Sequence, residues 1–599
     1  MKNAFASTAT LKFLLKEVHN VYDVIGKGRF AAYDEASVNL FIDSVQSFCE
    51  TDAFPFIKDM DEKPAVYENG SIKIHPQFEK IFKQAAELGL VAAFFDEEVG
   101  GLQMPATLFH SAYFLIEAAN NHVSGYLGLT AGSANLIANF GNEELKAHYL
   151  PKMLEMEWSG TMCLTEPQAG SSLSDIKTTA TPNDRGSYAI NGQKIFISSG
   201  DQQYVDNIIH LVLARIDGAP AGTKGVSLFV VPKKKSEGDA LVDNHVITAG
   251  EFEKLGQRGY CTAHLVFEES EGWLVGEANR GLSYMFQMMN EARIATGRMG
   301  AGIASAAYYA SLQYAHERPQ GRRLTSTGQK DLGTDQTLII NHPDVKRMLL
   351  LQKCIVEGSL SIILEASNYL DREMNATGEE KERYNLLLEL LTPVVKTYPA
   401  EKGLESVSQG LQVLGGYGFC MDFILQQYYR DIRIISIYEG TTGIQSLDLL
   451  GRKVMLHEGK VLQWLGEEIQ ATIKSAMPHA AMQEEAAELG AQLALVQQVL
   501  GALMPHAQKG DFERFLSDAT LFMDFFGTIV VGWQWLKMGV SAAEGLAQEP
   551  TASEKTFYES KIHCLKFFYK YELSRTKGLA KTIMKELSLT VDVNLEYFD

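Results

Sequence analysis

The spacing of apolar residues divides the chain into a helical part, a β-rich part and a second, longer helical part. In residues 1–160 apolar side chains recur at helical spacing, as at Phe78, Ile81, Phe82 and Ala85. We therefore predict an N-terminal α-helical domain over residues 1–160, which includes an N-terminal extension.

Between residues 161 and 280 the pattern changes to short β-rich runs separated by turns. The predicted strands are Tyr188 to Ile190, Lys194 to Ser198, Asn207 to Ile216, Val226 to Val231 and Ala263 to Phe267. Asn191-Gly192 lies between the first two strands, and this dipeptide is typical of a two-residue hairpin turn. No helical segments alternate with these strands, so we predict a small β-barrel or sandwich and not a doubly wound parallel sheet.

The helical spacing returns at Gly281 and persists to the end of the chain. Residues 281–460 predict a helical bundle, which a polar loop from Arg318 to about Asn341 interrupts. Residues 461–599 predict four or five further helices, which form an additional C-terminal helical domain. The expected fold class is therefore mainly α with a central β domain.

The most apolar window of the chain is Leu521 to Leu536. It spans 16 residues and contains Asp524 and Gln534. Because roughly 20 apolar residues are needed to cross a bilayer, this window predicts a buried helix. A membrane-surface helix would need a basic polar face, and Arg514, Asp518, Asp524 and Lys537 give no excess of positive charge, so we do not expect membrane association.

Composition excludes several classes of function. A net charge of −20 argues against a polyanionic partner such as DNA. The six cysteines are scattered without a C-x-x-C pair, so neither a zinc site nor a disulfide framework is expected. The N-terminal residues lack a long apolar run with a small-residue cleavage site, so we expect no export signal and a cytoplasmic location.

The segment from Asp431 to Lys453 carries the strongest candidate for chemistry. Its carboxylate, Glu439, follows three isoleucines and a tyrosine and precedes the turn Gly440–Gly443. Apolar surroundings disfavour the charged form, so we expect the pKa of Glu439 to rise towards the range useful to a general base. Taken alone, a glutamate before a glycine turn is more often a solvated surface residue.

Four other short segments contain residues suited to binding a ring or a phosphate. They are MCLTEPQAGSS (162–172), KIFISSG (194–200), AHERPQGR (315–322) and GLQVLGGYGF (410–419). Small hydroxyl donors and a glycine in the first, an aromatic ring in the second and an arginine in the third suit an electron-poor ring and a pyrophosphate. Each segment alone is also compatible with an ordinary turn, a surface charge or a helix C-cap.

Taken together and in this order, the segments resemble the acyl-CoA dehydrogenase family, flavoproteins that oxidise acyl-CoA thioesters to 2-enoyl-CoA. The resemblance covers about residues 75–460, and IYEGTTGIQ and LTEPQAGS are its most specific parts. The polar loop and the C-terminal extension look most like those of the 3-methylmercaptopropionyl-CoA dehydrogenases and their relatives. The resemblance implies an N-terminal helical domain, a β domain, a helical bundle and an extra helical domain.

The resemblance also implies the roles of individual residues. Glu439 matches the catalytic base. Residues that match FAD contacts are Thr165 and Ser198 at the isoalloxazine edge, Phe196 in place of a tryptophan beside the ring, Thr441 near the diphosphate, Ser171, and Arg318, Gln412 and Gly416, which in the family reach the FAD of a neighbouring subunit. Residues assigned to the substrate are Asn290 and Arg293 at the CoA moiety, together with Ser171, Tyr438 and Gly440.

Some positions depart from the family pattern. Ser172 stands where the family often has aspartate, Gly443 where many members have glutamine, and Gly321 where phenylalanine is usual. Some relatives carry the base on the long helix, at a position that is Ala292 here. The nearby Glu291 is one residue out of place, about 100° around a helix, so Glu439 remains the expected base.

The implied activity is FAD-dependent α,β-dehydrogenation of an acyl-CoA, with electrons passed to an electron-transferring flavoprotein. The substrate expected is 3-methylmercaptopropionyl-CoA or a medium- or long-chain acyl-CoA. Two alternatives stay open from sequence, an oxygen-using acyl-CoA oxidase and a flavin-binding, nucleic-acid-associated relative. We further expect a homodimer, because the apolar residues of 461–599 would pack on the core and occupy the surface that a tetramer uses.

Overall fold

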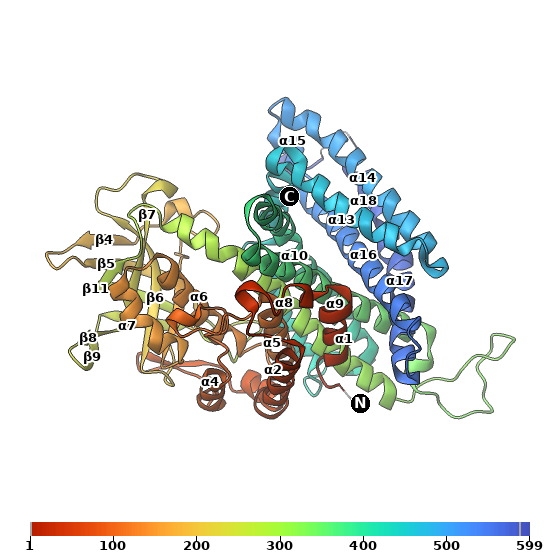
Figure 1. Cartoon of the computed structure of the whole chain (residues 1–599). Helices are drawn as coiled ribbons and strands as arrows, with labels where there is room; N and C mark the ends of the chain where they lie inside the picture. The colour runs from red at the N-terminus through yellow and green to blue at the C-terminus, as the bar shows by residue number, and fades with distance from the viewer. Residues whose placement is uncertain (1–2, 586–588) are drawn as a thin grey trace. The chain divides into compact units, whose positions relative to one another are not determined.

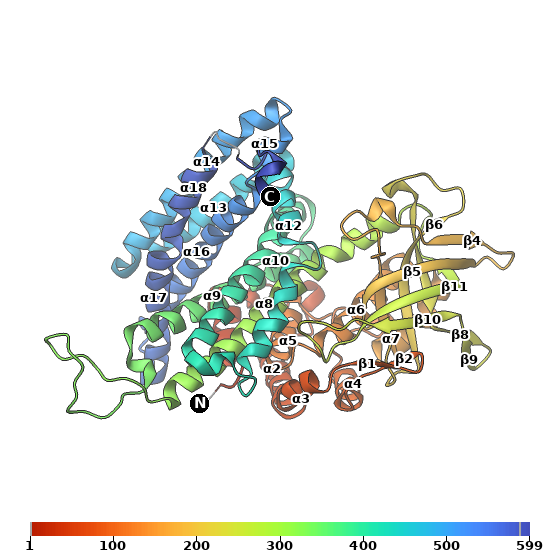
Figure 2. The same cartoon turned by 180° about the vertical axis from the view of Figure 1, so that it is seen from behind.

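The computed structural model describes residues 3–585 and 589–599, with residues 286–290 described by their backbone alone. The described chain forms two compact units. One contains residues 36–292, and the other contains residues 1–35 together with residues 293–599. Figures 1 and 2 show the β-sheet of the first unit and the long helices of the second from two sides.

The first unit begins with helices whose apolar faces are buried. They are α2 (Glu35–Phe48), α3 (Ile57–Glu62), α4 (Gln77–Glu87), α5 (Ala106–Ala119), α6 (Ser124–Phe140) and α7 (Glu143–Leu154), with the short strands β1 (Val66–Glu68) and β2 (Ser71–Lys73) between α3 and α4. In α4 the four apolar residues that predicted the helix are all at most 3% exposed. The helical spacing therefore reflects a buried stripe, as expected for a surface helix.

The β domain of this unit closes on itself. Its strands are β3 (Trp158–Cys163), β4 (Thr179–Pro182), β5 (Tyr188–Ser198), β6 (Asn207–Ile216), β7 (Val226–Pro232), β10 (Val246–Glu251) and β11 (Thr262–Leu274), while β8 (Lys234–Glu237) and β9 (Ala240–Asp243) form a separate hairpin. Strand β5 pairs with β11 and β4, β4 with β6, β6 with β7, and β7 again with β11. This ring of pairings is a small barrel (Figure 2).

The hairpin predicted at Asn191-Gly192 is wrong. Residues 188–198 form one continuous strand, β5, and both residues lie inside it. A side chain at Gly192 would meet Thr178 within 3 Å, so the glycine allows a close approach of two backbones. The Asn191 side chain accepts a hydrogen bond from the Glu269 amide at 2.9 Å, beside an irregularity in β11. Pairing on both sides of the strand therefore overrides the local turn preference.

The second unit consists of helices. They are α1 (Thr8–Phe13), α8 (Gly281–Glu317, which begins in the first unit), α9 (Pro343–Asn375), α10 (Gly378–Leu414), α11 (Leu425–Ile432), α12 (Thr442–Gly451), α13 (Lys460–Ala476), α14 (Gln483–Gln508), α15 (Phe512–Leu516), α16 (Ala519–Leu546), α17 (Ala552–Tyr571) and α18 (Thr576–Ile583). Local signals set several ends: Pro343 opens α9, and Thr551 with Glu554 forms a capping box at α17.

Helix α16 is the core of the C-terminal part, as predicted. Its rings Phe522, Phe525, Phe526, Trp533 and Trp535 are all at most 3% exposed. The indole N–H of Trp535 donates to the Cys354 carbonyl of α9 at 3.1 Å, and that of Trp533 donates to Thr472 of α13 at 2.8 Å. Both indoles of α16 thus have a hydrogen-bond partner, as buried indoles usually do.

The first residues of the chain pack within the second unit. His19 lies 2.8 Å from Glu365 and 3.1 Å from Ser361, both on α9. The Lys561 ammonium of α17 donates to the Thr10 hydroxyl at 3.0 Å. These buried polar contacts tie the N-terminal extension to helices that lie several hundred residues later in the sequence.

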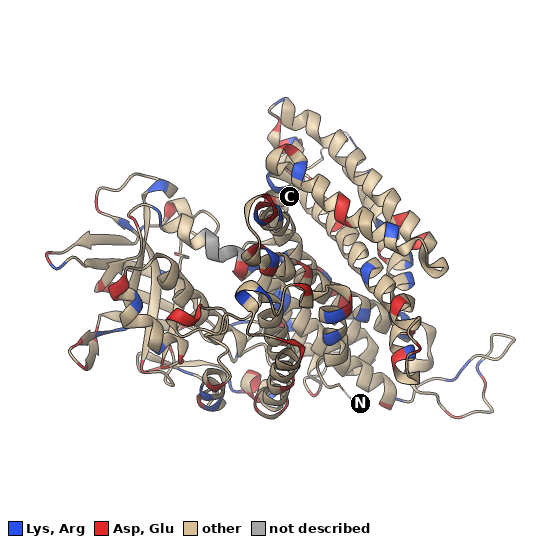
Figure 3. Cartoon of the chain, in the orientation of Figure 1, with Lys and Arg blue, Asp and Glu red and all other residues tan. Residues whose placement is uncertain are grey.

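Within the described part of the chain, two helical segments are long and apolar enough to cross a membrane by length and composition, Ala480–Gln508 and Ala519–Leu546. The apolar window of the second is 83% buried inside the protein, as expected for a core helix. Acidic and basic residues are interspersed along the helices between residues 461 and 585 (Figure 3), and pairs such as Lys577 with Glu488, 3.0 Å apart, mix the two signs.

Candidate active site

Glu439 lies on a tight turn between a short 3₁₀ helix, Arg433–Ser436, and helix α12. Its backbone is left-handed, with φ at +53°, a conformation that L-residues rarely adopt and that often marks functional sites. The turn therefore holds this carboxylate in a specific direction instead of letting the helix continue through it. Gly440, with φ at +87°, continues the left-handed path.

The surroundings of Glu439 raise its pKa, as the sequence predicted. Burial is the largest cause, because it disfavours the carboxylate, while the positive charges of Lys396 and Arg293 act in the opposite direction. Lys396 lies on α10 and Arg293 on α8, and neither lies within 4.0 Å of a Glu439 oxygen in the described part of the chain. The carboxylate thus faces two cations without being locked into an ion pair.

Gln445 fixes the turn from inside helix α12. Its side-chain amide is fully buried and donates to the backbone carbonyl of Glu439 at 3.2 Å. A side chain at Gly440 would meet that same amide nitrogen at 2.4 Å. Glycine is therefore required here both for its conformation and for the space that Gln445 occupies.

The two threonines after the turn begin helix α12. The Thr441 hydroxyl accepts a hydrogen bond from the Ile444 amide at 3.3 Å as the N-cap, which leaves its own proton for another acceptor. The Thr442 hydroxyl donates to Glu401 of α10. The helix N-terminus is consequently well defined, and such an end favours an anionic group.

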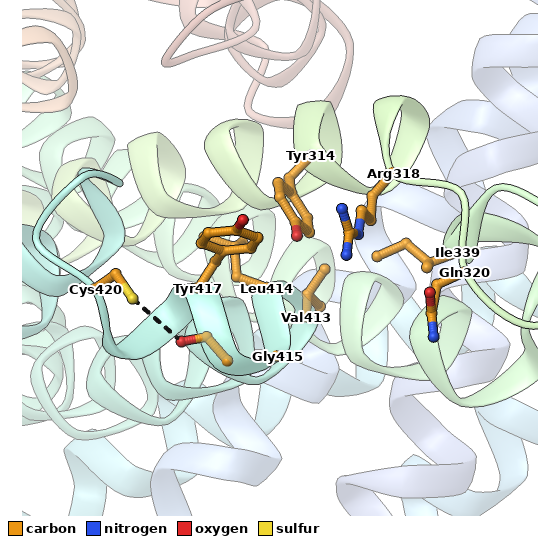
Figure 4. A pocket seen from close by; sticks show the side chains of 10 residues that line it. Tyr314, Arg318, Gln320, Ile339, Val413, Leu414, Gly415, Tyr417 and Cys420 are labelled. Atoms are coloured by element: carbon orange, nitrogen blue, oxygen red, sulfur yellow. Dashed lines mark hydrogen bonds between the residues drawn. The ribbon is translucent and has the colours of Figure 1, made fainter.

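A second part of the candidate site is a cavity of about 440 Å³ within the second unit. Arg318 and Tyr314 from the end of α8 face Gly415 and Tyr417 across it (Figure 4), and Gly416 also lines it. The Arg318 guanidinium lies 5.8 Å from the centre of the Tyr417 ring. A side chain added at Gly416 would meet nothing within 4 Å, so the backbone is open to a ligand. Gln412 is exposed one turn earlier and does not line this cavity.

The third part lies on the β domain. Strand β5 carries Phe196, which is 57% exposed, and Ser198 two residues later. The Ile195 amide of the same strand donates to the Thr165 carbonyl at 2.9 Å, which places the LTEPQAGS segment beside these residues. Phe196 has φ at +57° and its ring centre lies 4.5 Å from that of Phe252. The structure thus brings Thr165, Phe196 and Ser198 together on one edge of the barrel.

A buried ion pair shapes the segment around Thr165. Lys194 is fully buried, and its ammonium donates to the Leu164 carbonyl at 3.0 Å and to Glu166 at 2.8 Å. Glu166 also accepts hydrogen bonds from the Thr178 hydroxyl and from the Lys177 and Thr178 amides. Burial alone would raise the pKa of Glu166, but Lys194 and these donors lower it to about 2.

The remaining candidates are placed as follows. Ser171 and Ser172 are exposed, and the Ser172 hydroxyl donates to Asp175 at 2.5 Å. Arg293 is 8% exposed and lies 3.4 Å from Asp448, so part of its charge is engaged within the protein. The Tyr438 hydroxyl lies 3.3 Å from the Met299 sulfur. The side chain of Asn290 lies outside the described residues.

Sequence reasoning missed the residues that support the site. The turn at Glu439 is held by contacts of Lys396 and Gln445, and the segment around Thr165 is held by contacts of Glu166 and Lys194. None of these four residues was predicted from the sequence. A signal exists for Lys396, because it is a single charge within the apolar run TPVVKTYP of α10, and a lysine in a buried helix needs a polar partner. Glu166 lies inside a motif that was noticed for its hydroxyl groups.

The residues of the three parts fit FAD. An exposed aromatic ring with hydroxyl groups beside it suits the flavin ring, and an arginine above an open glycine backbone suits the pyrophosphate. No cluster of three or more histidine, cysteine or acidic side chains that could hold a metal occurs among the described residues.

Comparison with known proteins connects these features. Domain descriptions of the acyl-CoA dehydrogenases match in order: the N-terminal domain at residues 36–157, the middle domain at 161–270, the C-terminal domain at 279–455, and "Acetyl-CoA dehydrogenase C-terminal like" at 465–594.

Individual relatives agree along nearly the whole chain. The 3-methylmercaptopropionyl-CoA dehydrogenase of Ruegeria pomeroyi is 37% identical over 518 residues, which cover 86% of this chain and 87% of that protein. The broad-specificity linear acyl-CoA dehydrogenase FadE5 of Mycobacterium tuberculosis is 32% identical, with coverage of 93% and 94%.

A solved structure, an acyl-CoA dehydrogenase from Bacillus anthracis complexed with FAD, shares the fold at a TM-score of 0.73 and 21% identity, with coverage of 94% and 90%. The central β domain between helical domains and the extra C-terminal helical domain are thus confirmed. The chain belongs to the acyl-CoA dehydrogenase family, whose members are FAD-dependent oxidoreductases of acyl-CoA thioesters.

Proposed function

We propose that this enzyme removes the α-proton of an acyl-CoA thioester with Glu439 and passes the electrons of the substrate, through FAD, to an electron-transferring flavoprotein. The observation that carries the proposal is the left-handed turn at Glu439. It presents one carboxylate whose pKa is raised by burial, beside two cations that do not pair with it directly. A base with a raised pKa accepts a proton from carbon more readily near neutral pH.

FAD, when bound, supplies the acceptor for the hydride that leaves the β-carbon. The chain supplies the rest of the chemistry. Glu439 takes the α-proton, and its backbone N–H hydrogen-bonds the thioester oxygen where negative charge develops. Exclusion of water when the cofactor and the thioester fill the site strengthens both interactions.

We propose that Thr165, Phe196 and Ser198 contact the flavin ring and that Arg318 and Gly416 contact the pyrophosphate of a neighbouring copy's FAD. The exposed ring of Phe196 offers a face for stacking. Arg318 lines an open cavity and can form a bidentate contact with a phosphate. Gln412 does not line this cavity, so it would bind the cofactor from outside it or not at all.

A site completed by a second copy makes the enzyme a homodimer. In support, α16 is buried within the chain, so its apolar face is covered without a further subunit. Sedimentation or light scattering of the FAD-loaded enzyme tests this proposal. A dimer is expected, whereas an FAD-loaded monomer or a tetramer would contradict it.

For the substrate we propose 3-methylmercaptopropionyl-CoA or a medium- or long-chain linear acyl-CoA. The support is that a relative of this name is 37% identical over most of the chain, and that a relative acting on linear acyl-CoA is 32% identical. We place the enzyme in the cytoplasm, since its six cysteines are unpaired and five of them are buried.

One experiment tests the proposed reaction. The oxidised enzyme is mixed anaerobically with 3-methylmercaptopropionyl-CoA and with acyl-CoA thioesters from short to long chains, and the flavin absorbance is followed. Bleaching is expected, with reoxidation by electron-transferring flavoprotein much faster than by air. Fast reoxidation by air alone would indicate an oxidase, and no bleaching by any thioester would overturn the proposal.

A further inference from the structure

The carbonyl of Ile435 has an unusual partner. In a regular helix this carbonyl would accept the amide of Glu439, four residues later. It accepts instead the ammonium of Lys396, at 2.7 Å, from helix α10. The Glu439 amide has no hydrogen-bond partner within the described chain.

Lys396 is itself in an unusual environment. It is fully buried, and no carboxylate oxygen lies within 4.0 Å of its ammonium among the residues that the structure describes. Burial lowers its pKa to about 8, while the negative charges of Glu401 and Glu439 act to raise it. At pH 7 the ammonium is therefore still protonated, and a buried charge without a direct counterion lies close to the base.

Few other charges act on the turn. Arg293 of α8 is the second cation that affects Glu439, and it is engaged by Asp448 of α12, 3.4 Å away. Arg452, the residue that follows α12, is held by Asp448 at 2.7 Å. Glu401 of α10 accepts from Thr442. Of the two described cations that act on Glu439, Lys396 is therefore the one that forms no ion pair.

We propose that Lys396 is a positioning residue for the reaction. By holding the carbonyl of Ile435 it keeps the amide of Glu439 available to the thioester oxygen, and by its charge it favours the ionised form of Glu439. This inference rests on the proposed role of Glu439 as the base. It assigns to one buried side chain both the geometry and the proton affinity of the catalytic turn.

A purely structural lysine would satisfy the Ile435 carbonyl and do nothing more. The two roles differ in the pH dependence of the reaction. If the charge of Lys396 acts on Glu439, its removal makes the carboxyl group harder to ionise, and the rate needs a higher pH. If the lysine is structural, its removal lowers the rate equally at all pH values.

The test compares Lys396→Met with the wild type as FAD-loaded enzymes. The acidic limb of kcat/KM is expected to move upward by about 1 pH unit, and the rate on its plateau to fall about tenfold. Lys396→Arg keeps the charge, so its acidic limb is expected to stay at the wild-type position even where its bulk lowers the rate.

Lys402→Met is the matched control. Lys402 is a buried lysine of the same helix, but it contacts Glu405 and Asp524 and does not reach the turn. Its loss is expected to lower stability and to leave the acidic limb in place. An unchanged acidic limb in folded, FAD-loaded Lys396→Met would overturn the inference, as would a shift of equal size in Lys402→Met.

A second measurement does not depend on catalysis. Thermal unfolding of the wild type, Lys396→Met, Glu439→Gln and the double variant forms a cycle that reports the coupling of the two side chains. Glu439→Gln is expected to raise the melting temperature more in the Lys396→Met background, because the carboxylate there lacks its nearby cation. Equal effects in both backgrounds would contradict the coupling.

The same variants separate this inference from the proposed function. If Glu439→Gln retains near-native turnover, the assignment of the base fails and the role of Lys396 fails with it. If Glu439→Gln is inactive while Lys396→Met shows neither the pH shift nor the coupling, the proposed function stands and Lys396 is structural.

Discussion

Two buried lysines organise two turns of this enzyme in opposite ways. Lys194, in the β domain, lies 2.8 Å from Glu166. The carboxylate of Glu166 accepts further hydrogen bonds, and together these contacts lower its pKa to about 2. Lys396, in the helical unit, binds a carbonyl and has no carboxylate within 4.0 Å among the described residues. The pKa of the carboxylate near it, Glu439, is raised.

The difference shows how one residue type serves two purposes. A lysine paired directly with a carboxylate fixes a segment and removes that carboxylate from chemistry, because its proton affinity becomes too low. A lysine that binds a backbone carbonyl near the carboxylate stabilises the turn but leaves the carboxylate able to accept a proton. The first arrangement suits the segment proposed to bind the flavin, and the second suits the proposed base.

The largest effect is expected from breaking the direct pair. Lys194→Met leaves the Glu166 carboxylate buried without its cation and should lower the free energy of unfolding by about 3–5 kcal/mol. Denaturant unfolding followed by circular dichroism measures this. Lys577→Met removes an exposed lysine paired with Glu488 at 3.0 Å and should change stability little. Equal losses in the two variants would mean that Lys194 is not a structural anchor.

The carboxylates of Glu166 and Glu439 should also make the stability of the protein depend on pH in opposite directions. Glu166 has a lowered pKa, so its stabilisation is present above the unfolded value of about 4.5 and is lost as the pH falls towards 2. A shift of this size corresponds to about 3 kcal/mol. Glu166→Gln should therefore be destabilised at pH 7, and the difference from the wild type should disappear near pH 2.

Glu439 has a raised pKa, so its carboxylate costs stability above that pKa, and the cost disappears below the unfolded value. Glu439→Gln should consequently be more stable than the wild type at pH 7 and equal to it at pH 4. Unfolding curves across this pH range check both signs. A destabilised Glu439→Gln at pH 7 would mean that the carboxylate is paired after all.

A smaller effect is expected at the glycine of the base turn. Gly440→Ala places a side chain at φ +87° and 2.4 Å from the Gln445 amide, so we expect a loss of about 1–3 kcal/mol and slower flavin reduction. In Gly443→Ala the new side chain meets its nearest neighbour, the Thr441 hydroxyl, at 3.8 Å. Gly443 lies in the first turn of α12, so we expect Gly443→Ala, as the control, to leave the stability unchanged or to raise it slightly.

The smallest effect is expected at the flavin side. Phe196→Trp replaces one exposed ring by a larger one and should change FAD retention by less than about threefold, whereas Phe196→Ala removes the stacking face and should weaken it about tenfold. Fluorescence of released FAD on dilution measures both. Equal retention in the two variants would show that the ring does not contact the cofactor.

Much of the fold could be predicted from periodicity. The buried stripe of α4, the buried α16 and strands β6 and β7 follow directly from the spacing of apolar residues. The hairpin at Asn191-Gly192 could not be predicted correctly, since its outcome depends on Thr178 and on pairing with β11. Local turn preference is weak against two ladders of hydrogen bonds.

The site was predictable to a different degree. The raised pKa of Glu439 followed from its apolar neighbours, and the motif placed Thr165 beside Phe196 and Ser198. The left-handed turn, the buried Gln445 and the partners of the two lysines were not predictable, because they depend on helices and strands that meet only in the folded chain. Charges on separate elements leave no spacing in a sequence.

The identity of the base is the central claim, and single-turnover flavin reduction tests it most directly. Glu439→Gln and Glu291→Gln, both loaded with FAD, are mixed anaerobically with the acyl-CoA that the wild type reduces fastest. We expect Glu439→Gln to keep its FAD and to react at least about 100-fold more slowly, while Glu291→Gln reacts at nearly the wild-type rate. Near-native reduction in Glu439→Gln, with loss in Glu291→Gln, would contradict the assignment.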